Sequence, residues 1–272
     1  MKVLWLGLEQ MSTVGFIETK TMNKGNYSLE EVKRFNPDII FEREFNADGM
    51  SWEKEIKEMK AALPHVKTAV WLIDTHVRKD FHKQYAKNFD YVFMAISHLM
   101  HEIDHPNRFW LPLCHTANFV PEFKTTREHE LGFIGRFNAP FLENRTEFIK
   151  KVKEMYPDFY AVTDYNNLYE NMSKIKIMVN LSYNQDMNFR TFEALACGNI
   201  LVTSTVPDLF KVSGLRERIF VFNDYDELKE IVDSLKDKTP INHQKWILDH
   251  HTPENRLISA VKMIITNQQE DF

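Results

Sequence analysis

Short apolar runs rich in β-branched and aromatic residues alternate with charged amphipathic stretches along the whole chain. Two such stretches are residues 51–63 and 81–87. The apolar runs fall into two sets of five, namely residues 3–6, 39–41, 69–73, 91–95 and 109–113, then 131–134, 159–162, 175–181, 200–203 and 219–222. Alternation of this kind predicts an α/β protein built of βαβ units, with parallel sheets covered by helices on both faces.

The chain is long enough for two domains. At 272 residues it passes the size at which a single hydrophobic core usually stops growing. A polar stretch with Pro121 separates the two sets of runs, and proline cannot join a central strand. We place the hinge near residues 118–130 and predict Rossmann-like domains at 1–123 and 124–272, the second including the terminal helix. Ligands of open parallel sheets bind at the carboxyl ends of strands, so we expect an interdomain cleft.

Composition and charge exclude several classes of protein. The 34 Lys and Arg against 39 Asp and Glu give a net charge of −5, which argues against a dedicated nucleic-acid binder. No apolar run approaches the roughly 18 residues of a membrane-spanning helix, and the opening run is too short for a signal peptide. We therefore expect a soluble, cytoplasmic protein. The two cysteines, Cys114 and Cys197, have neither disulfide nor zinc spacing, and we expect both to be buried.

The segment 180–199 carries the most chemical information. Asp186 and Asn188 are candidate N-caps and Gly198 is a candidate C-cap, so a helix of about ten residues fits between them. At about 100° per residue, Arg190 and Glu193 lie opposite the apolar arc and are expected to face away from the core. The apolar arc holds Phe189, Phe192, Leu195 and Ala196.

This arrangement suits an anionic diphosphate. A helix start offers free backbone N–H groups, and Arg190 adds a fixed cation with a bidentate fork. One turn further on, Glu193 is placed to accept the two hydroxyls of a ribose, as acidic residues do in dinucleotide-binding folds. The alternative is an ordinary surface ion pair between the same two side chains.

Two further segments place polar residues just after predicted strands. Gly135 and Arg136 follow residues 131–134, where glycine permits close approach of a phosphate and arginine neutralises it; a simple turn is the alternative. Asp74 and His76 follow residues 69–73, the position of a catalytic loop in a parallel sheet; helix capping is the alternative.

Taken in order, seven landmarks resemble the CgeB-like (spore maturation protein) glycosyltransferases. They are WLIDTH, FDYVFMA, FWLPLCHTANF, LGFIGRFN with Arg145, MVNLSYN, RTFEALACGNILVTS and HTPENRLISAVKMI. The resemblance reaches over most of the chain. It implies the GT-B fold, in which two Rossmann-like domains face a cleft, the C-terminal one holding a nucleotide-sugar donor and the N-terminal one the acceptor.

The resemblance also assigns roles to single residues. Glu193 matches the glutamate that binds the donor ribose, and Arg136 and Arg190 match positions near the diphosphate. Asn180 matches the asparagine that ends the strand before the donor loop. Gly135 and Thr191 complete the predicted donor-binding set. Gln185 departs from the pattern, because related retaining transferases carry a glutamate eight residues before the ribose-binding one.

We therefore predict a glycosyltransferase that moves a hexose, from a UDP-sugar in preference, to an acceptor hydroxyl. No cofactor or metal is expected, because Asp224 and Asp226 are explained by helix capping. Asp74 or His76 is the predicted base if the anomeric centre inverts. Two alternatives stay open: a phage-type transferase acting on a modified DNA base, and a non-catalytic nucleotide-binding homologue. The acceptor, whether glycan, protein, small molecule or nucleic acid, is left open.

Overall fold

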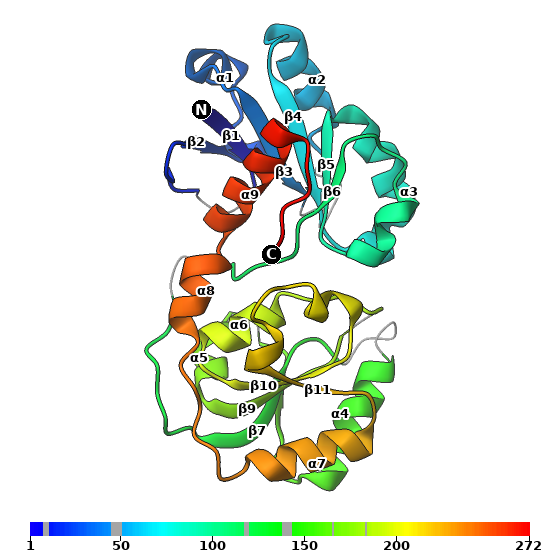
Figure 1. The fold of residues 1–272 in the computed structure, drawn as a ribbon, viewed down its shortest axis with the longest axis vertical. Helices are drawn as coiled ribbons and strands as arrows, with labels where there is room; N and C mark the ends of the chain where they lie inside the picture. Colours follow the sequence, from blue (N-terminus) through cyan, green and yellow to red (C-terminus); the bar gives the residue numbers. More distant parts are fainter. Residues whose placement is uncertain (8–10, 45–50, 117–119, 138–142, 165, 183) are drawn as a thin grey trace. The chain divides into compact units, whose positions relative to one another are not determined.

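The protein contains two parallel sheets, each with its own helices (Figure 1). The structure is a computed structural model that describes residues 1–7, 11–44, 51–116, 120–137, 143–164, 166–182 and 184–272. By their contacts, Met1–Pro112 and Pro253–Phe272 form one compact unit, and Leu113–Thr252 form the other. Each unit is described by itself.

The first unit is built on a six-stranded sheet with the strand order β2-β1-β3-β4-β5-β6. Its strands are β1 (Lys2–Leu6), β2 (Glu18–Met22), β3 (Ile39–Glu44), β4 (Lys67–Leu72), β5 (Tyr91–Met94) and β6 (Arg108–Trp110). Neighbouring strands pair in parallel, and Glu44 at the end of β3 pairs with Leu72 at the end of β4. The loops after β3 and β4 therefore begin side by side.

Helices cover both faces of this sheet. The helices are α1 (Leu29–Phe35), α2 (Glu53–Ala62), α3 (Thr75–Tyr85) and α9 (Pro253–Thr266). Side chains from α1, α2 and α3 share a core with Leu4, Ile40 and Val70 of the sheet. The other face carries a row of aromatic rings, in which Trp5 stacks on Phe41 with a centroid distance of 5.2 Å, and α9 crosses β1 and β3 in Figure 1.

The second unit is built on a five-stranded parallel sheet with the order β11-β10-β9-β7-β8. Its strands are β7 (His129–Ile134), β8 (Tyr160–Val162), β9 (Ile175–Asn180), β10 (Ile200–Ser204) and β11 (Ile219–Phe222). Its helices are α4 (Glu143–Met155), α5 (Leu168–Ser173), α6 (Arg190–Ala196), α7 (Tyr225–Leu235) and α8 (Gln244–His250). The carboxyl ends of β7 and β9 are neighbours, which brings the loops after them together.

Short 3-10 helices occupy several connections. They are η1 (Lys24–Asn26), η2 (Ala86–Asn88), η3 (Ser97–Glu102), η5 (Pro207–Phe210) and η6 (Arg216–Arg218). Among the residues described, no helix combines the length and apolar character needed to cross a membrane.

The ten predicted strands are confirmed to within a few residues, but β2 was missed. Its sequence, ETKTM, is polar, and four of its five residues are not buried because it lies at the edge of the sheet beside β1. An edge strand needs only one hydrogen-bonded neighbour and little apolar character, so hydrophobic patterning does not reveal it.

The contacts divide the chain differently from the predicted boundary at 123/124. They place the boundary between Pro112 and Leu113 and assign the terminal helix to the first unit. The physical reason is a set of polar contacts at β6: Arg256 Nε donates to Pro112 O at 2.7 Å. Gln269 also pairs with the backbone N and O of Trp110. The predicted cleft between the domains stays a prediction.

Candidate donor site and acceptor-side residues

Asn180 ends β9 and orders the start of the loop that follows. It is 3% exposed, and its Nδ2 donates to Thr203 Oγ1 of β10 at 3.1 Å. A pair of amide hydrogen bonds, both 3.2 Å, joins Asn180 to Asn188 just before α6. The predicted strand-ending asparagine is therefore a link between β9, β10 and the loop that precedes α6.

Helix α6 starts and ends close to where the sequence placed it, but its N-cap was wrong. Phe189 is the N-cap residue and makes no side-chain capping bond. Asn188 is engaged with Asn180 instead, and Asp186 is 7% exposed. The C-cap residue is Cys197, and the predicted glycine follows it: Gly198 has a φ of +70°, in the left-handed region that favours glycine.

Arg190 and Glu193 form an ion pair, with Arg190 Nη1 3.0 Å from Glu193 Oε2. Their side chains are only 11% and 7% exposed, so the expectation that they face away from the core is wrong. α6 packs against β9 and β10 on one side and α8 on another, and Phe192 contacts the ring of His251. A helical wheel identifies the apolar face of a helix, but it cannot show that an element distant in sequence also buries another face of that helix.

The Glu193 carboxylate retains capacity for further hydrogen bonds. Thr116 Oγ1 lies 3.3 Å from Glu193 Oε1, and Arg190 occupies Oε2. A carboxylate offers about four lone-pair positions, so two protein donors do not saturate it. The burial of both side chains also excludes the alternative of a solvated surface ion pair. Removing one partner of a buried pair would leave the other charge buried and unpaired.

Thr191, between these two residues, has an unsatisfied hydroxyl. The residue is 1% exposed, and within the described part of the chain Thr191 Oγ1 has no hydrogen-bond partner. Buried hydroxyls are normally bonded, so this one marks a place where a polar partner would be stabilising.

Gly135 and Arg136 follow β7 as predicted. The Gly135 N–H donates to Val162 O at 3.0 Å, and the Arg136 side chain is exposed. Arg145 of α4 donates to Arg136 O at 3.1 Å and to Leu181 O at 3.0 Å. One guanidinium thus ties the loop after β7 to the loop after β9. The sequence analysis gave Arg145 only as a landmark, and no local pattern reveals that it bridges two loops.

Asp74 and His76 lie in the first unit at the junction of β4 and α3. Asp74 has a φ of +58° and its side chain makes no capping bond, so simple helix capping does not explain it. The surrounding protein raises the pKa of the Asp74 carboxyl above its ordinary value, chiefly by desolvation. Desolvation lowers the pKa of His76, an effect that Asp74 opposes.

Sequence reasoning missed a group of buried polar residues beside this junction. Glu42 and Glu44 are each 2% exposed, and both contact α3, through Tyr85 and His82 respectively. The predicted strand ended at residue 41 because charged residues follow it, whereas β3 continues through Glu44 with every residue buried. Alternation of acids along an otherwise buried strand was the available signal.

The remaining predictions from single motifs are confirmed. Asp224 Oδ1 accepts the Glu227 N–H at 2.9 Å and caps α7. Cys114 and Cys197 are both free and buried. Of the sequence landmarks, residues 117–119, 138 and 183 lie outside the described residues.

The Glycosyl transferase-like family model matches residues 118–261, just over half of the chain. The chain belongs to this glycosyl transferase-like family. The match spans the segments that hold Arg136, Asn180, Arg190 and Glu193. No curated protein matches the sequence.

Solved glycosyltransferase structures resemble the whole chain. A glycosyltransferase from Rickettsia africae is 13% identical with a TM-score of 0.52, over 98% of this chain and 99% of that one. Anabaena HepE, solved with UDP and glucose, is 11% identical with a TM-score of 0.55, over 97% and 100%. Sucrose-phosphate synthase from Thermosynechococcus elongatus is 12% identical with a TM-score of 0.53, over 88% and 75%.

At such low identity these likenesses show the fold. The two parallel sheets with their Rossmann-like arrangement of helices form the GT-B fold of the glycosyltransferases. The predicted α/β, GT-B class is confirmed.

Proposed function

We propose that this glycosyltransferase is a CgeB-like member that transfers a hexose from a UDP-sugar to an acceptor hydroxyl without a metal ion. The observation that carries the proposal is the Glu193 carboxylate, fixed by Arg190 and Thr116 within the family-matched region. A fixed carboxylate with spare lone pairs suits the two adjacent hydroxyls of a ribose. HepE, a structural neighbour, was solved with UDP and with UDP-glucose.

In this proposal the arginines stabilise the negative charge of the departing diphosphate. Arg190 is a buried cation one turn from Glu193, and Arg136 is an exposed cation after β7. Guanidinium groups bind phosphate oxygens with two parallel hydrogen bonds, which stabilises charge that develops as the diphosphate departs. Thr191 belongs to the proposed donor-binding set through its place between Arg190 and Glu193, but at 1% exposed its hydroxyl is closed to direct contact with the ligand.

The acceptor chemistry requires a base if the anomeric centre inverts. The acceptor oxygen forms a bond to the sugar C1, the bond from C1 to the diphosphate oxygen breaks, and its electron pair leaves with UDP. The acceptor proton passes to Asp74 or His76. The raised pKa of Asp74 brings this carboxyl nearer to neutral pH, where a general base works best. The lowered pKa of His76 keeps its ring neutral at pH 7 and so able to accept a proton.

A non-catalytic nucleotide binder is the second candidate. Gln185 occupies the position of the expected donor-sugar glutamate, and it is exposed with a φ of +60°. An amide cannot carry the negative charge of a glutamate. Binding of UDP without turnover of any UDP-sugar would favour this candidate.

The donor assignment is tested by thermal shift with UDP. A ligand that binds only the folded state stabilises it and so raises the melting temperature. The free energy of unfolding rises by about 2.7 kcal/mol when the free ligand concentration is 100 times Kd. We expect UDP to stabilise the wild type and Glu193→Gln to lose that shift. Glu170→Gln is the matched control, because Glu170 is an exposed partner of Lys174 in the same unit. Stabilisation of Glu193→Gln equal to that of the control would refute the donor site.

Turnover is tested with labelled UDP-glucose, UDP-galactose and UDP-GlcNAc. Release of UDP from one of them, with and without candidate acceptors, identifies the donor. Repeating the assay with EDTA tests metal independence. If the protein instead binds glucosylatable DNA, with an affinity that falls steeply as the salt concentration rises, the result would support the modified-base transferase.

A further inference from the structure

Glu44 places a buried carboxylate at the end of β3, next to the junction that carries Asp74. Its side chain is 1% exposed, and its two oxygens have different partners on α3. Arg78 Nη1 pairs with Oε1, and His82 Nε2 lies 3.0 Å from Oε2. A carboxylate removed from water needs such partners, so Glu44 fixes the position of both side chains.

His82 extends this contact to the residue between Asp74 and His76. His82 Nδ1 lies 3.0 Å from Thr75 Oγ1, and both residues are 0% exposed. The His82 ring thus bridges Glu44 through Nε2 and Thr75 through Nδ1. The connectivity is that of a hydrolase triad, but a fully buried threonine cannot reach a substrate. The chain of contacts therefore orients the backbone at Thr75.

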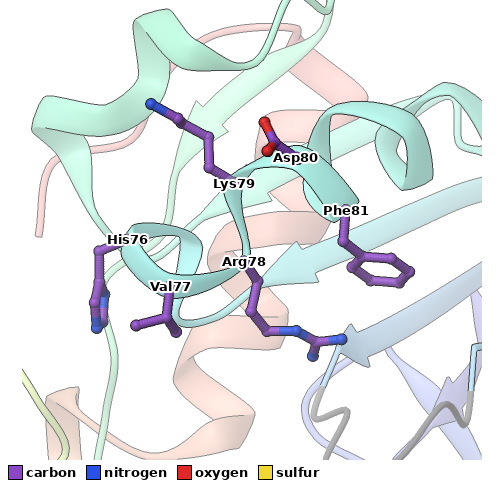
Figure 2. A pocket seen from close by; sticks show the side chains of 6 residues that line it. All are labelled: His76, Val77, Arg78, Lys79, Asp80 and Phe81. Carbon is purple, nitrogen blue, oxygen red and sulfur yellow. The ribbon is translucent and has the colours of Figure 1, made fainter. Parts of the chain in front are cut away.

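The local backbone depends on the same contacts. Arg78 has φ −125° and ψ 23°, which interrupts α3 after its first turn. The kink lets Arg78 reach Glu44 and lie 4.7 Å above the Phe81 ring. Figure 2 shows His76 and Val77 on one side of the kinked segment and Arg78 reaching away from them. The residues from His76 to Phe81 line a hollow of about 350 Å³.

We propose that Glu44 is a positioning residue for the acceptor-side base, acting through His82 and Thr75 and through Arg78. Glu44 does not touch substrate in this proposal. It holds the first turn of α3 and thereby sets the direction in which Asp74 and His76 project. The inference rests on the proposed function of these two residues.

The charges around Asp74 support this role. Desolvation is the main cause of the raised pKa of Asp74; the charge of Glu44 raises it further, whereas His76, His82 and Arg78 lower it. The charge of His98 in η3 also lowers the pKa of His76. Replacing Glu44 with glutamine removes one of the two causes that raise the pKa of Asp74 and leaves Arg78 without its carboxylate. The pKa of Asp74 should therefore fall, and the acid limb of the pH profile should move to lower pH.

Two other carboxylates that contact α3, one from β3 and one from η3, provide matched controls. Glu42 anchors the far end of the helix through Tyr85, and burial raises its pKa to about 8. Glu42→Gln therefore replaces a carboxyl that is already protonated at neutral pH. Glu102 pairs with Lys79 and Lys83 on the outer side of the helix. Either variant tests whether general loosening of α3 is enough to change the site.

The experiment compares Glu44→Gln and Thr75→Val with Glu42→Gln and Glu102→Gln in the full chain. Turnover of the UDP-sugar is measured from pH 5 to 9, UDP binding by thermal shift, and the Asp74 carboxyl by ¹³C NMR titration, assigned with Asp74→Asn. We expect kcat to fall by tenfold or more, up to about 100-fold, with UDP binding kept. The Asp74 titration midpoint should move to lower pH in Glu44→Gln alone among the carboxyl variants.

The outcomes separate the two proposals. If the wild type binds UDP but turns over no UDP-sugar, the transferase function fails, and the NMR midpoint still decides the role of Glu44. If Glu44→Gln and Thr75→Val match the controls in turnover and in the Asp74 midpoint, the positioning role is overturned. Should Glu44→Gln not fold, Thr75→Val decides, because it removes only the hydroxyl that contacts His82.

Discussion

The hydroxyl of Tyr85 lies 2.7 Å from Glu42 Oε2 and 2.8 Å from Oε1, inside the core of the first unit. The same hydroxyl accepts the backbone N–H of Trp52 at the start of α2. Burial raises the pKa of Glu42 to about 8, the hydrogen bond from Tyr85 opposes the rise, and the charge of Glu44 adds to it. A neutral carboxyl therefore joins β3, α3 and α2 at neutral pH.

This protonation predicts a loss of stability as pH rises. The carboxyl titrates near 4.5 when unfolded and near 8 when folded, so below pH 4.5 both states are protonated. Between these values only the folded state keeps the proton, and the free energy of unfolding falls with pH by a few kcal/mol, at about 1.4 kcal/mol per pKa unit. Urea unfolding at pH 5, 6, 7 and 8 measures the slope.

Glu42→Gln should flatten that slope, because an amide has no proton to lose in this range. Glu102→Gln is the control, since its lysine partners lower the pKa of the half-buried Glu102 and keep it from titrating between pH 5 and 8. An unchanged slope in Glu42→Gln would show that another group causes the dependence.

The Arg190 and Glu193 pair predicts strong coupling between two substitutions. Removing one partner leaves the other charge buried and unpaired, which typically costs about 3–5 kcal/mol. This range is an upper limit here, because the two side chains are still 11% and 7% exposed. We expect Arg190→Gln and Glu193→Gln each to lower the free energy of unfolding. The double variant should lose less than the sum, with a coupling energy of about 1–3 kcal/mol. Additive losses in urea unfolding would contradict the pair.

Arg145 predicts an effect on nucleotide binding from outside the donor set. Its two hydrogen bonds hold the loops after β7 and β9 together, and each such bond contributes about 1–3 kcal/mol when the donor is charged. Arg145→Ala should weaken UDP binding by about tenfold or more, measured by calorimetry. Lys150→Ala is the control, because Lys150 is an exposed cation on the same helix. Equal UDP affinities in the two variants would show that Arg145 does not hold these loops in place for nucleotide binding.

Local patterning predicted most of the fold and the places where the site residues emerge. Apolar strands such as residues 175–180 are visible because burial on both faces of a parallel sheet demands continuous apolar sequence. Asp74 and Arg136 were found for the same reason, since each follows such a strand, whereas Asn180, the last residue of β9, was assigned from the family resemblance. β2 lacks this signal because it is an edge strand.

Long-range packing accounts for what the sequence could not predict. The burial of Glu193 depends on Thr116 and α8, which are distant in sequence. The Glu44, His82 and Thr75 chain joins residues up to 38 positions apart, so no motif spacing describes it. The grouping of the terminal helix with the first unit depends on a bond across 144 positions, between Arg256 and Pro112.

That bond supplies the last prediction. Arg256 is 2% exposed, donates to Pro112 O at 2.7 Å and lies 5.2 Å from the Phe272 ring. Arg256→Leu should destabilise the protein by about 1–3 kcal/mol, because the buried carbonyl loses its charged donor. Lys262→Ala, an exposed partner of Glu270 on the same helix, is the control. In hydrogen exchange, Arg256→Leu should increase exchange together in β6 and α9, while β9 and β10 stay protected. Increased exchange in the second sheet instead would show that the terminal helix stabilises the second unit.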